Sequence, residues 1–312
     1  MVKTCSIVWV ILVLFVAGNT SYAQPTEESI TYLSVSRSDM TVDLFDARSG
    51  ELVAALPSPF EPSLETNRYR VADVTCSNDG VYCAVVYTIQ FGGSILRIVD
   101  IALETYRDKE LSETINDVDW HPTRYELAMS NSLLIGSGYA DSQVTFMDIE
   151  FKQLQYLELD SVPFTLDWHP LGTFIAISRR ATIDIYSNET LEKVTTFALA
   201  HTDRPFVWQI VWNETGNQLI SVMENQVVIW SMETSTPLLA IPTDKYVYKA
   251  AWNDTSTLLS TETYDTLTVW DAVTGDIVFE TNDNIYDYQW VSTNEVSVLY
   301  ASGDVAVITV KD

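Results

Sequence analysis

The sequence has 312 residues, of which 43 are Asp or Glu and 17 are Lys or Arg, so its formal net charge at pH 7 is −26. A nucleic acid needs a cationic track on its partner, and an anionic membrane surface attracts basic segments. The charge therefore argues against both as partners. It favours solubility and carries no information about fold.

Residues 1–23 have the pattern of a secretory signal peptide. A basic residue precedes an apolar run from Ile7 to Ala17, and small residues follow up to Ala23. The run is short for a bilayer span, and polar residues follow it closely. We expect cleavage after Ala23, which leaves a secreted or periplasmic chain with no stable membrane anchor. A retained anchor is the alternative.

Two cysteines, Cys76 and Cys83, remain in the mature sequence. They flank the turn "SNDGVY" of an expected hairpin, where two antiparallel strands would bring them face to face. An even number of cysteines in an oxidising compartment fits a disulfide bond. Two buried thiols that serve as small apolar side chains are the alternative. We expect no catalytic role in either case.

An internal repeat organises residues 24–312. Six segments read as an alternating strand, an anchor residue, a polar turn and a second alternating strand, for example "INDVDWHPTRYELAMS" and "VWQIVWNETGNQLISV". The anchor of the first copy is Cys76, and the anchors of the other five are Trp120, Trp168, Trp212, Trp252 and Trp290. A bulky indole at the same position of five copies is expected to pack between neighbouring units.

A second half-unit follows each of these segments. The two clearest copies, "DTLTVWDAVTGDIVFE" (Asp265–Glu280) and "DMTVDLFDARSGELVAA" (Asp39–Ala55), agree almost position by position. The two halves together give four short strands in about 43 residues, which is typical of one blade of a β-propeller.

These segments resemble the WD-repeat β-propeller family. Trp270-Asp271 is the dipeptide that names the family, and Phe45-Asp46 is a degenerate version of it. The resemblance implies an all-β fold with a single propeller of four-stranded antiparallel blades, seven in our count and six in the alternative. The expected blades lie near residues 30–56, 69–104, 115–158, 162–199, 206–241, 246–280 and 285–312. The first and last units each lack a different strand, and the two ends are expected to meet and close the ring.

The resemblance also implies a buried network in the fifth blade. In the family, a histidine in the position of His201 contacts a Ser or Thr that bonds the tryptophan of the third strand, and an acid orients the histidine. The matching residues here are Ser221, Trp230 and Glu224. A hydrolase triad has a similar composition, but Ser221 lacks the Gly-x-Ser-x-Gly turn that exposes a nucleophile. A structural network is therefore the favoured interpretation.

The sequence contains no recognisable motif for a metal or a cofactor. His121 and His169 follow two of the anchor tryptophans into polar turns, and zinc would need three or four ligands at one site. A Walker loop, a dinucleotide-binding fingerprint, His-Glu-x-x-His and Cys-x-x-Cys are all absent from the sequence. We therefore expect no cofactor and no bound metal, and we interpret both histidines as turn residues.

One face of the propeller is expected to bind a partner. The loops between blades and the loops between second and third strands emerge on the same face, and loops longer than their counterparts usually mark a binding face. The expected contact residues are Phe60, Arg68, Tyr69, Arg70, Phe91, Leu134, Tyr139, Arg179, Arg180 and Arg204. The arginines would suit carboxylate or phosphate groups on the partner. Neutralisation of neighbouring acids is an equally open explanation.

The expected function is that of a monomeric, exported, non-enzymatic scaffold that binds a protein, a peptide or a polymer. The alternative is a secreted hydrolase or lyase that uses carboxylates of the central channel. That alternative needs two or more acids converging from the innermost strands, and segments such as "VWQIVW" and "VYKAAW" are mostly apolar. The sequence therefore favours the scaffold.

Overall fold

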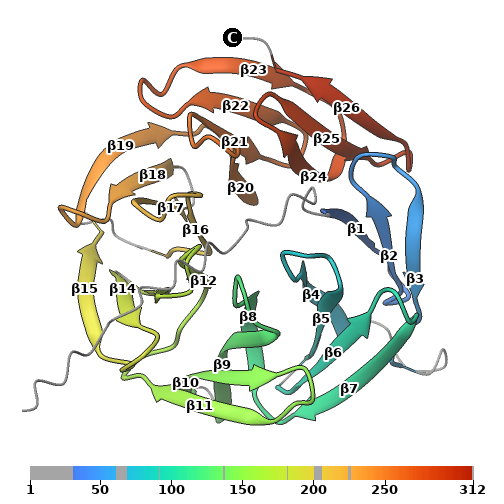
Figure 1. The fold of residues 1–312 in the computed structure, drawn as a ribbon, viewed down its shortest axis with the longest axis vertical. Helices are drawn as coiled ribbons and strands as arrows, with labels where there is room; N and C mark the ends of the chain where they lie inside the picture. Colours follow the sequence, from blue (N-terminus) through green and yellow to red (C-terminus); the bar gives the residue numbers. More distant parts are fainter. Residues whose placement is uncertain are drawn as a thin grey trace, which may run out of the picture.

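The computed structural model describes residues 31–60, 69–90, 92–135, 138–180, 182–199, 206–223 and 226–310, without the side chains of residues 134–141. Within these ranges all regular structure is β-strand, and the strands form seven antiparallel sheets placed radially around one axis (Figure 1). The predicted seven-bladed propeller is confirmed, and the six-bladed alternative is wrong. The predicted signal peptide lies outside the described residues.

The sheets are built from consecutive strands. Blade one contains β1 (Tyr32–Ser36), β2 (Val42–Asp46) and β3 (Leu52–Leu56). Blade two contains β4 (Tyr69–Cys76), β5 (Tyr82–Ile89), β6 (Ser94–Asp100) and β7 (Thr105–Leu111), and so extends past the expected end at residue 104. Blade three contains β8 (Thr114–Trp120), β9 (Glu126–Ile135), β10 (Gly138–Asp148) and β11 (Gln153–Glu158).

The remaining blades follow in the same order. Blade four contains β12 (Leu166–Trp168), β13 (Phe174–Arg179), β14 (Thr182–Ser187) and β15 (Lys193–Ala198). Blade five contains β16 (Gln209–Trp212), β17 (Gln218–Met223), β18 (Gln226–Ser231) and β19 (Thr236–Pro242). Blade six contains β20 (Lys249–Trp252), β21 (Leu258–Glu262), β22 (Leu267–Asp271) and β23 (Ile277–Thr281). Blade seven contains β24 (Ile285–Ser292), β25 (Glu295–Tyr300) and β26 (Val305–Thr309).

Short aspartate turns join the third and fourth strands of a blade. Asp271 ends β22, and its carboxylate accepts bonds from the backbone N–H groups of Val273 (2.8 Å) and Thr274 (2.7 Å). Gly275 then has a φ of +77°, a conformation that glycine adopts without steric cost. The turn over residues 46–50 of blade one repeats this arrangement. The Asp and Gly of the repeated segment therefore set these hairpins.

The anchor tryptophans lie between the blades. Four of them are buried and Trp290 is half-buried. Three of the indoles donate a bond to a backbone oxygen on the innermost strand of the preceding blade: Trp120 to Thr75 (3.1 Å), Trp212 to Asp167 (3.2 Å) and Trp252 to Val211 (3.2 Å). An indole that fills the gap and also bonds the neighbouring strand fixes the depth at which two blades meet.

His121 and His169 contact the anchor of the following blade. The ring centroid of His121 lies 4.8 Å from that of Trp168, and the centroid of His169 lies 5.2 Å from that of Trp212. Burial lowers the pKa of His121 to about 4, so this ring is neutral at pH 7. The structure thus places both histidines in the packing between blades.

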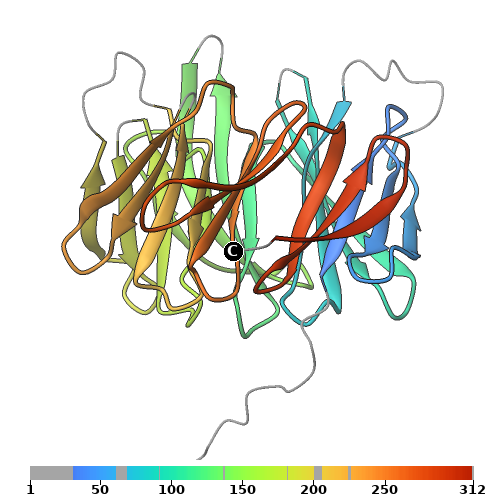
Figure 2. The ribbon, with the colours of Figure 1, turned by 90° about the horizontal axis from the view of Figure 1, so that it is seen from above.

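Blades one and seven have three strands each and meet through side chains. Asp287 on β24 accepts a bond from the backbone N–H of Ser34 on β1 (2.9 Å), and Arg48 donates to the backbone oxygen of Val291 (2.6 Å). A small apolar cluster lies across this joint and includes Leu33, Ala47, Val291 and Leu299. Figure 2 shows the blades from the side, standing next to one another as upright sheets. The described strands of blade one and blade seven form separate sheets.

Candidate functional site

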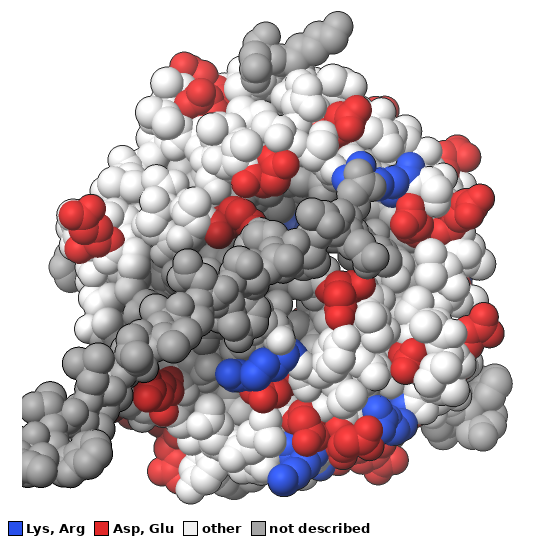
Figure 3. All heavy atoms as spheres, in the orientation of Figure 1, with Lys and Arg blue, Asp and Glu red and all other residues white. Residues whose placement is uncertain are grey.

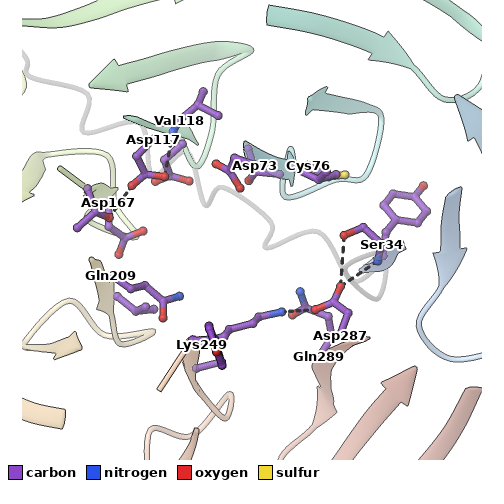
Figure 4. Close-up of a pocket in the computed structure, with 18 of the residues that line it drawn as sticks. Ser34, Asp73, Cys76, Asp117, Val118, Asp167, Gln209, Lys249, Asp287 and Gln289 are labelled. Atoms are coloured by element: carbon purple, nitrogen blue, oxygen red, sulfur yellow. Dashed lines mark hydrogen bonds and ion pairs between the residues drawn. The ribbon is translucent and has the colours of Figure 1, made fainter. Parts of the chain in front are cut away.

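A cavity of about 1000 Å³ lies at the axis of the propeller, between the innermost strands (Figure 4). Its acidic lining residues are Asp73, Asp117, Asp119, Asp167, Glu214, Glu262 and Asp287. Among the described residues, its basic lining residue is Lys249. The cavity is therefore strongly acidic.

Several of these side chains connect the innermost strand of one blade to that of the next. Each innermost strand is the inner edge of its sheet, so the backbone N–H groups that point away from the sheet have no neighbouring strand to bond. The carboxylate of Asp117 accepts from the backbone N–H of Leu166 (2.8 Å), and Asp119 accepts from that of Trp168 (2.8 Å). Gln209 and Asp287 bond the next blade in the same way. These acceptors hold the inner rim of the ring together.

Two pairs of the carboxyl groups interact electrostatically, Asp73 with Asp117 and Asp119 with Asp167. Burial raises the pKa of Asp73 and of Asp119 to about 6. Burial and the charge of the partner carboxylate raise the pKa of Asp117 and of Asp167 well above the usual range.

Lys249 lies on the opposite side of the cavity from these pairs (Figure 4). Its Nζ donates to Asp287 Oδ1 (2.6 Å) and to the backbone oxygen of Tyr288 (2.8 Å). Burial raises the pKa of the nearby Glu262 to about 7, although the charge of Lys249 opposes the rise. The charge of Lys249, the basic lining residue named above, is therefore already paired with the carboxylate of Asp287.

The expectation that the innermost strands are mostly apolar is wrong for blades two, three, four and seven. It was drawn from blades five and six, whose innermost strands carry Gln209 and Lys249 at the channel. The aligned segments "VADVTC", "INDVDW", "PFTLDW" and "IYDYQW" carry an aspartate at the third position, at the fifth position, or, in "INDVDW", at both. Residues two apart on a strand face the same side, and this spacing was the available sequence evidence for an acidic channel.

A row of contacting aromatic rings lies beside the mouth of the cavity, and we call it the aromatic arc. Its members are Phe164, Phe206, Trp208, Tyr246 and Tyr248, with successive ring centroids 4.1, 5.8, 4.3 and 4.9 Å apart. Phe206 is 38% exposed, Tyr246 43% and Tyr248 55%. Trp208 and Tyr248 also line the cavity, as does the exposed Tyr286.

The aromatic arc belongs to the face on which a partner was predicted, but to other blades. Its residues lie at the entry of the innermost strands of blades four, five and six, after the loops that join these blades. The turns between first and second strands emerge on the opposite face, since consecutive antiparallel strands reverse direction. Seven of the ten predicted contact residues belong to blades one to three, and no residue of the arc was among the ten.

The predicted contact residues of blades one and two pack against one another. The ring of Phe60 stacks on that of Tyr69, with centroids 3.7 Å apart, and meets Tyr87 edge-on at 6.0 Å. Arg70 donates from Nε to Thr88 Oγ1 (2.9 Å). Phe60 and Tyr69 are thus packed together against the buried Tyr87.

The predicted arginines of blade four are placed differently from each other. Arg179 is bonded to Asp160 and to the buried Asp184, whereas Arg180 is exposed. Figure 3 shows the opposite face of the ring, with the turns between first and second strands toward the viewer, and the basic side chains visible there also lie next to acidic ones. Three predicted contact residues lie outside the described residues, namely Arg68, Phe91 and Arg204. Leu134 and Tyr139 pair through their backbones on β9 and β10, and their side chains lie outside the description.

Half of the network implied for blade five is present in the described residues. The indole N–H of Trp230 donates to Ser221 Oγ (2.9 Å), whereas His201 and Glu224 lie outside the described residues. Blade six has the same bond between Trp270 and Thr261 Oγ1 (2.8 Å). The bond from third to second strand is thus a feature of two blades.

Cys76 and Cys83 form a disulfide bond between β4 and β5, across the register position at which the two strands pair them. Across the described ranges no group of three or more His, Cys, Asp or Glu side chains is arranged to hold a metal ion. The same part of the chain has no helix with the length and hydrophobicity needed to cross a membrane.

Comparison with known proteins gives similarity in structure only. No protein-family model matches the sequence, and no curated protein matches it. A chain of the Mitotic Checkpoint Complex crystal structure superposes with a TM-score of 0.67 at 17% identity, over 90% of this chain and 86% of that chain. The β-propeller domain of Swd1 from Myceliophteria thermophila gives a TM-score of 0.66 at 14% identity, over 90% and 94%. At these identities the likeness shows a shared propeller fold, and fold alone does not specify function.

Proposed function

We propose that this chain is an exported WD-repeat propeller that binds a protein or peptide partner, without catalysis, on the face that carries the aromatic arc. The arc is the observation that carries the proposal. A contiguous exposed apolar surface usually marks an interaction site, and aromatic side chains dominate the energetic centres of protein interfaces. Three of its five rings are more than a third exposed.

Further observations support parts of this proposal. The signal-like pattern of residues 1–23 supports export. The bonds of Trp230 and Trp270 to the second strand support a WD-repeat origin for blades five and six. The similar chain of the Mitotic Checkpoint Complex is part of a protein assembly, which agrees with a partner-binding role for this fold.

The proposal is tested by affinity capture with the purified mature chain, residues 24–312, as bait. The test variant combines Tyr246→Ser and Tyr248→Ser, which shorten two exposed rings of the arc. The control combines Leu171→Ser and Val273→Ser, since these side chains are 71% and 82% exposed in turns of the opposite face. We expect a protein that is retained by wild type and by the control and lost with the test variant. Retention by all three baits would contradict the proposed surface.

A hydrolase or lyase that uses channel carboxylates is the second candidate. The raised pKa values of the two aspartate pairs favour it, because a protonated carboxyl beside an ionised one can supply a general acid and a general base. Against it, Asp117 and Asp119 each accept a strand N–H and so already have a structural role. Turnover of glycoside, ester or peptide substrates by wild type, abolished in Asp73→Asn, would establish this candidate in place of the first.

A further inference from the structure

We infer that the partner presents an exposed basic segment, whose Lys or Arg side chains contact the aromatic arc and enter the mouth of the acidic cavity. The inference rests on the proposed function and names the chemistry of the partner. Its basis is that exposed aromatic rings and an excess of acidic side chains line one and the same cavity.

The aromatic arc offers ring faces to a cation. Trp208 and Tyr246 stack with an angle of 17° between their planes, and Tyr248 lies beside them with more than half of its surface exposed. A guanidinium or ammonium group over such a ring is attracted by its negative face. An arginine also stacks on a ring through its own plane.

The cavity next to the arc adds charge of the complementary sign. Trp208, Tyr248 and Tyr286 line it together with seven carboxyl groups, and the lining lysine already bonds Asp287. The net charge of −26 over the whole chain steers cations toward such an opening and anions away from it. A basic segment therefore gains binding free energy from contact with the aromatic rings and from the negative electrostatic potential of the cavity.

Two of the described cations on this face are paired with neighbouring acids. Arg179 bonds Asp160 and Asp184, and Lys245 bonds Asp265 (2.7 Å). These pairs reduce the positive charge that would be free for an anionic partner. The prediction of anionic groups on the partner stays untested, and the described geometry favours the opposite sign.

Two other occupants complement the opening less well. Residues 24–30, "QPTEESI", contain two glutamates and no basic residue, so the chain's own N-terminal segment adds negative charge. A second copy of the chain brings its own charge of −26 to the contact. Both would be repelled by the cavity.

Hexaarginine is the probe, titrated calorimetrically into the mature chain at pH 8. At this pH Asp73, Asp119 and Glu262, whose pKa values are raised to about 6, 6 and 7, are ionised. We expect binding that weakens as salt is raised, and a loss of about tenfold in affinity in Tyr248→Ser and in Glu262→Gln. Leu171→Ser, on the opposite face, should bind like wild type. Circular dichroism checks that each variant is folded.

Hexacitrulline has the same shape without the charge, and cellohexaose tests a neutral sugar chain. Failure of hexaarginine to bind, equal binding of hexacitrulline, or binding of cellohexaose but not of hexaarginine each overturns the inference. Hexaarginine affinity that is unchanged in Tyr248→Ser overturns it as well, because the arc would then not be the contact. Loss of captured protein in the arc variant together with no hexaarginine binding would leave the proposed function standing and remove only this inference.

Discussion

The aspartates of the channel should make the protein less stable as the pH rises from 4 to 7, and Asp119→Asn should remove part of this dependence. Burial raises the pKa of Asp119 from 3.8 to about 6. The folded chain therefore holds this proton more tightly than the unfolded chain does. The stability contributed by the protonated group is complete below pH 4 and is lost as the pH rises through about 6.

The size of the effect follows from the pKa rise. Each tenfold change in an acid constant is worth about 1.4 kcal/mol, so a pKa rise from 3.8 to about 6 corresponds to about 3 kcal/mol. An asparagine keeps an oxygen that can accept from the N–H of Trp168 but carries no charge. We expect the free energy of unfolding of Asp119→Asn to match that of wild type near pH 4 and to exceed it by up to about 3 kcal/mol at pH 8.

Urea unfolding followed by tryptophan fluorescence, at pH values from 4 to 8, measures this difference. Asp244→Asn is the matched control because that side chain is exposed, so its curve should run parallel to wild type. A parallel curve for Asp119→Asn as well, or a variant that loses more stability than wild type as the pH rises, would refute the assignment of a raised pKa to this carboxyl.

Two further pairs of variants probe the packing that supports the site. Gly216→Ala should lower the free energy of unfolding by more than about 2 kcal/mol, because φ is +69° and the new Cβ would lie 1.9 Å from His169 Nε2. Gly303→Ala should lower it by about 1 kcal/mol, because φ is +89° but the space around the new Cβ is open. Thermal unfolding measures both. Arg97→Ala should lower the free energy of unfolding in urea by about 3 kcal/mol, because the guanidinium is only 1% exposed and bonds Asp108 twice. Arg107→Ala should lower it by under about 1 kcal/mol, because the ion pair of Arg107 with Glu150 is exposed. Equal costs within either pair of variants would contradict the packing described.

The propeller could be predicted because its determinants recur at one position of each repeat. Trp212 and Trp252 stand at the same place in aligned segments, and both bond the preceding blade. A packing requirement repeated in this way is visible without any structure. The Asp and Gly of the turn before β23 were equally visible in the matched half-units.

The channel was missed because its residue type changes from blade to blade. The third position of the innermost strand is Asp73 in blade two, Gln209 in blade five and Lys249 in blade six. Gln209 accepts a bond from the next strand and Lys249 donates one to it, so the requirement fixes hydrogen-bonding capacity rather than a residue. The arc was missed for another reason: Trp208 and Tyr246 are distant in sequence, and only the radial packing of blades five and six stacks them.

The joint between blades one and seven differs from the other six in one respect. Every other pair of neighbouring blades is also linked by the chain itself, whereas here two sheets touch through the bonds of Asp287 and Arg48 and a small apolar cluster. Local opening of the circle therefore costs least at this seam, since no covalent connection must be stretched. Among the innermost strands, amide hydrogen exchange should be fastest in β1 and β24. A ligand that bridges these two strands would slow the exchange and stabilise the closed ring.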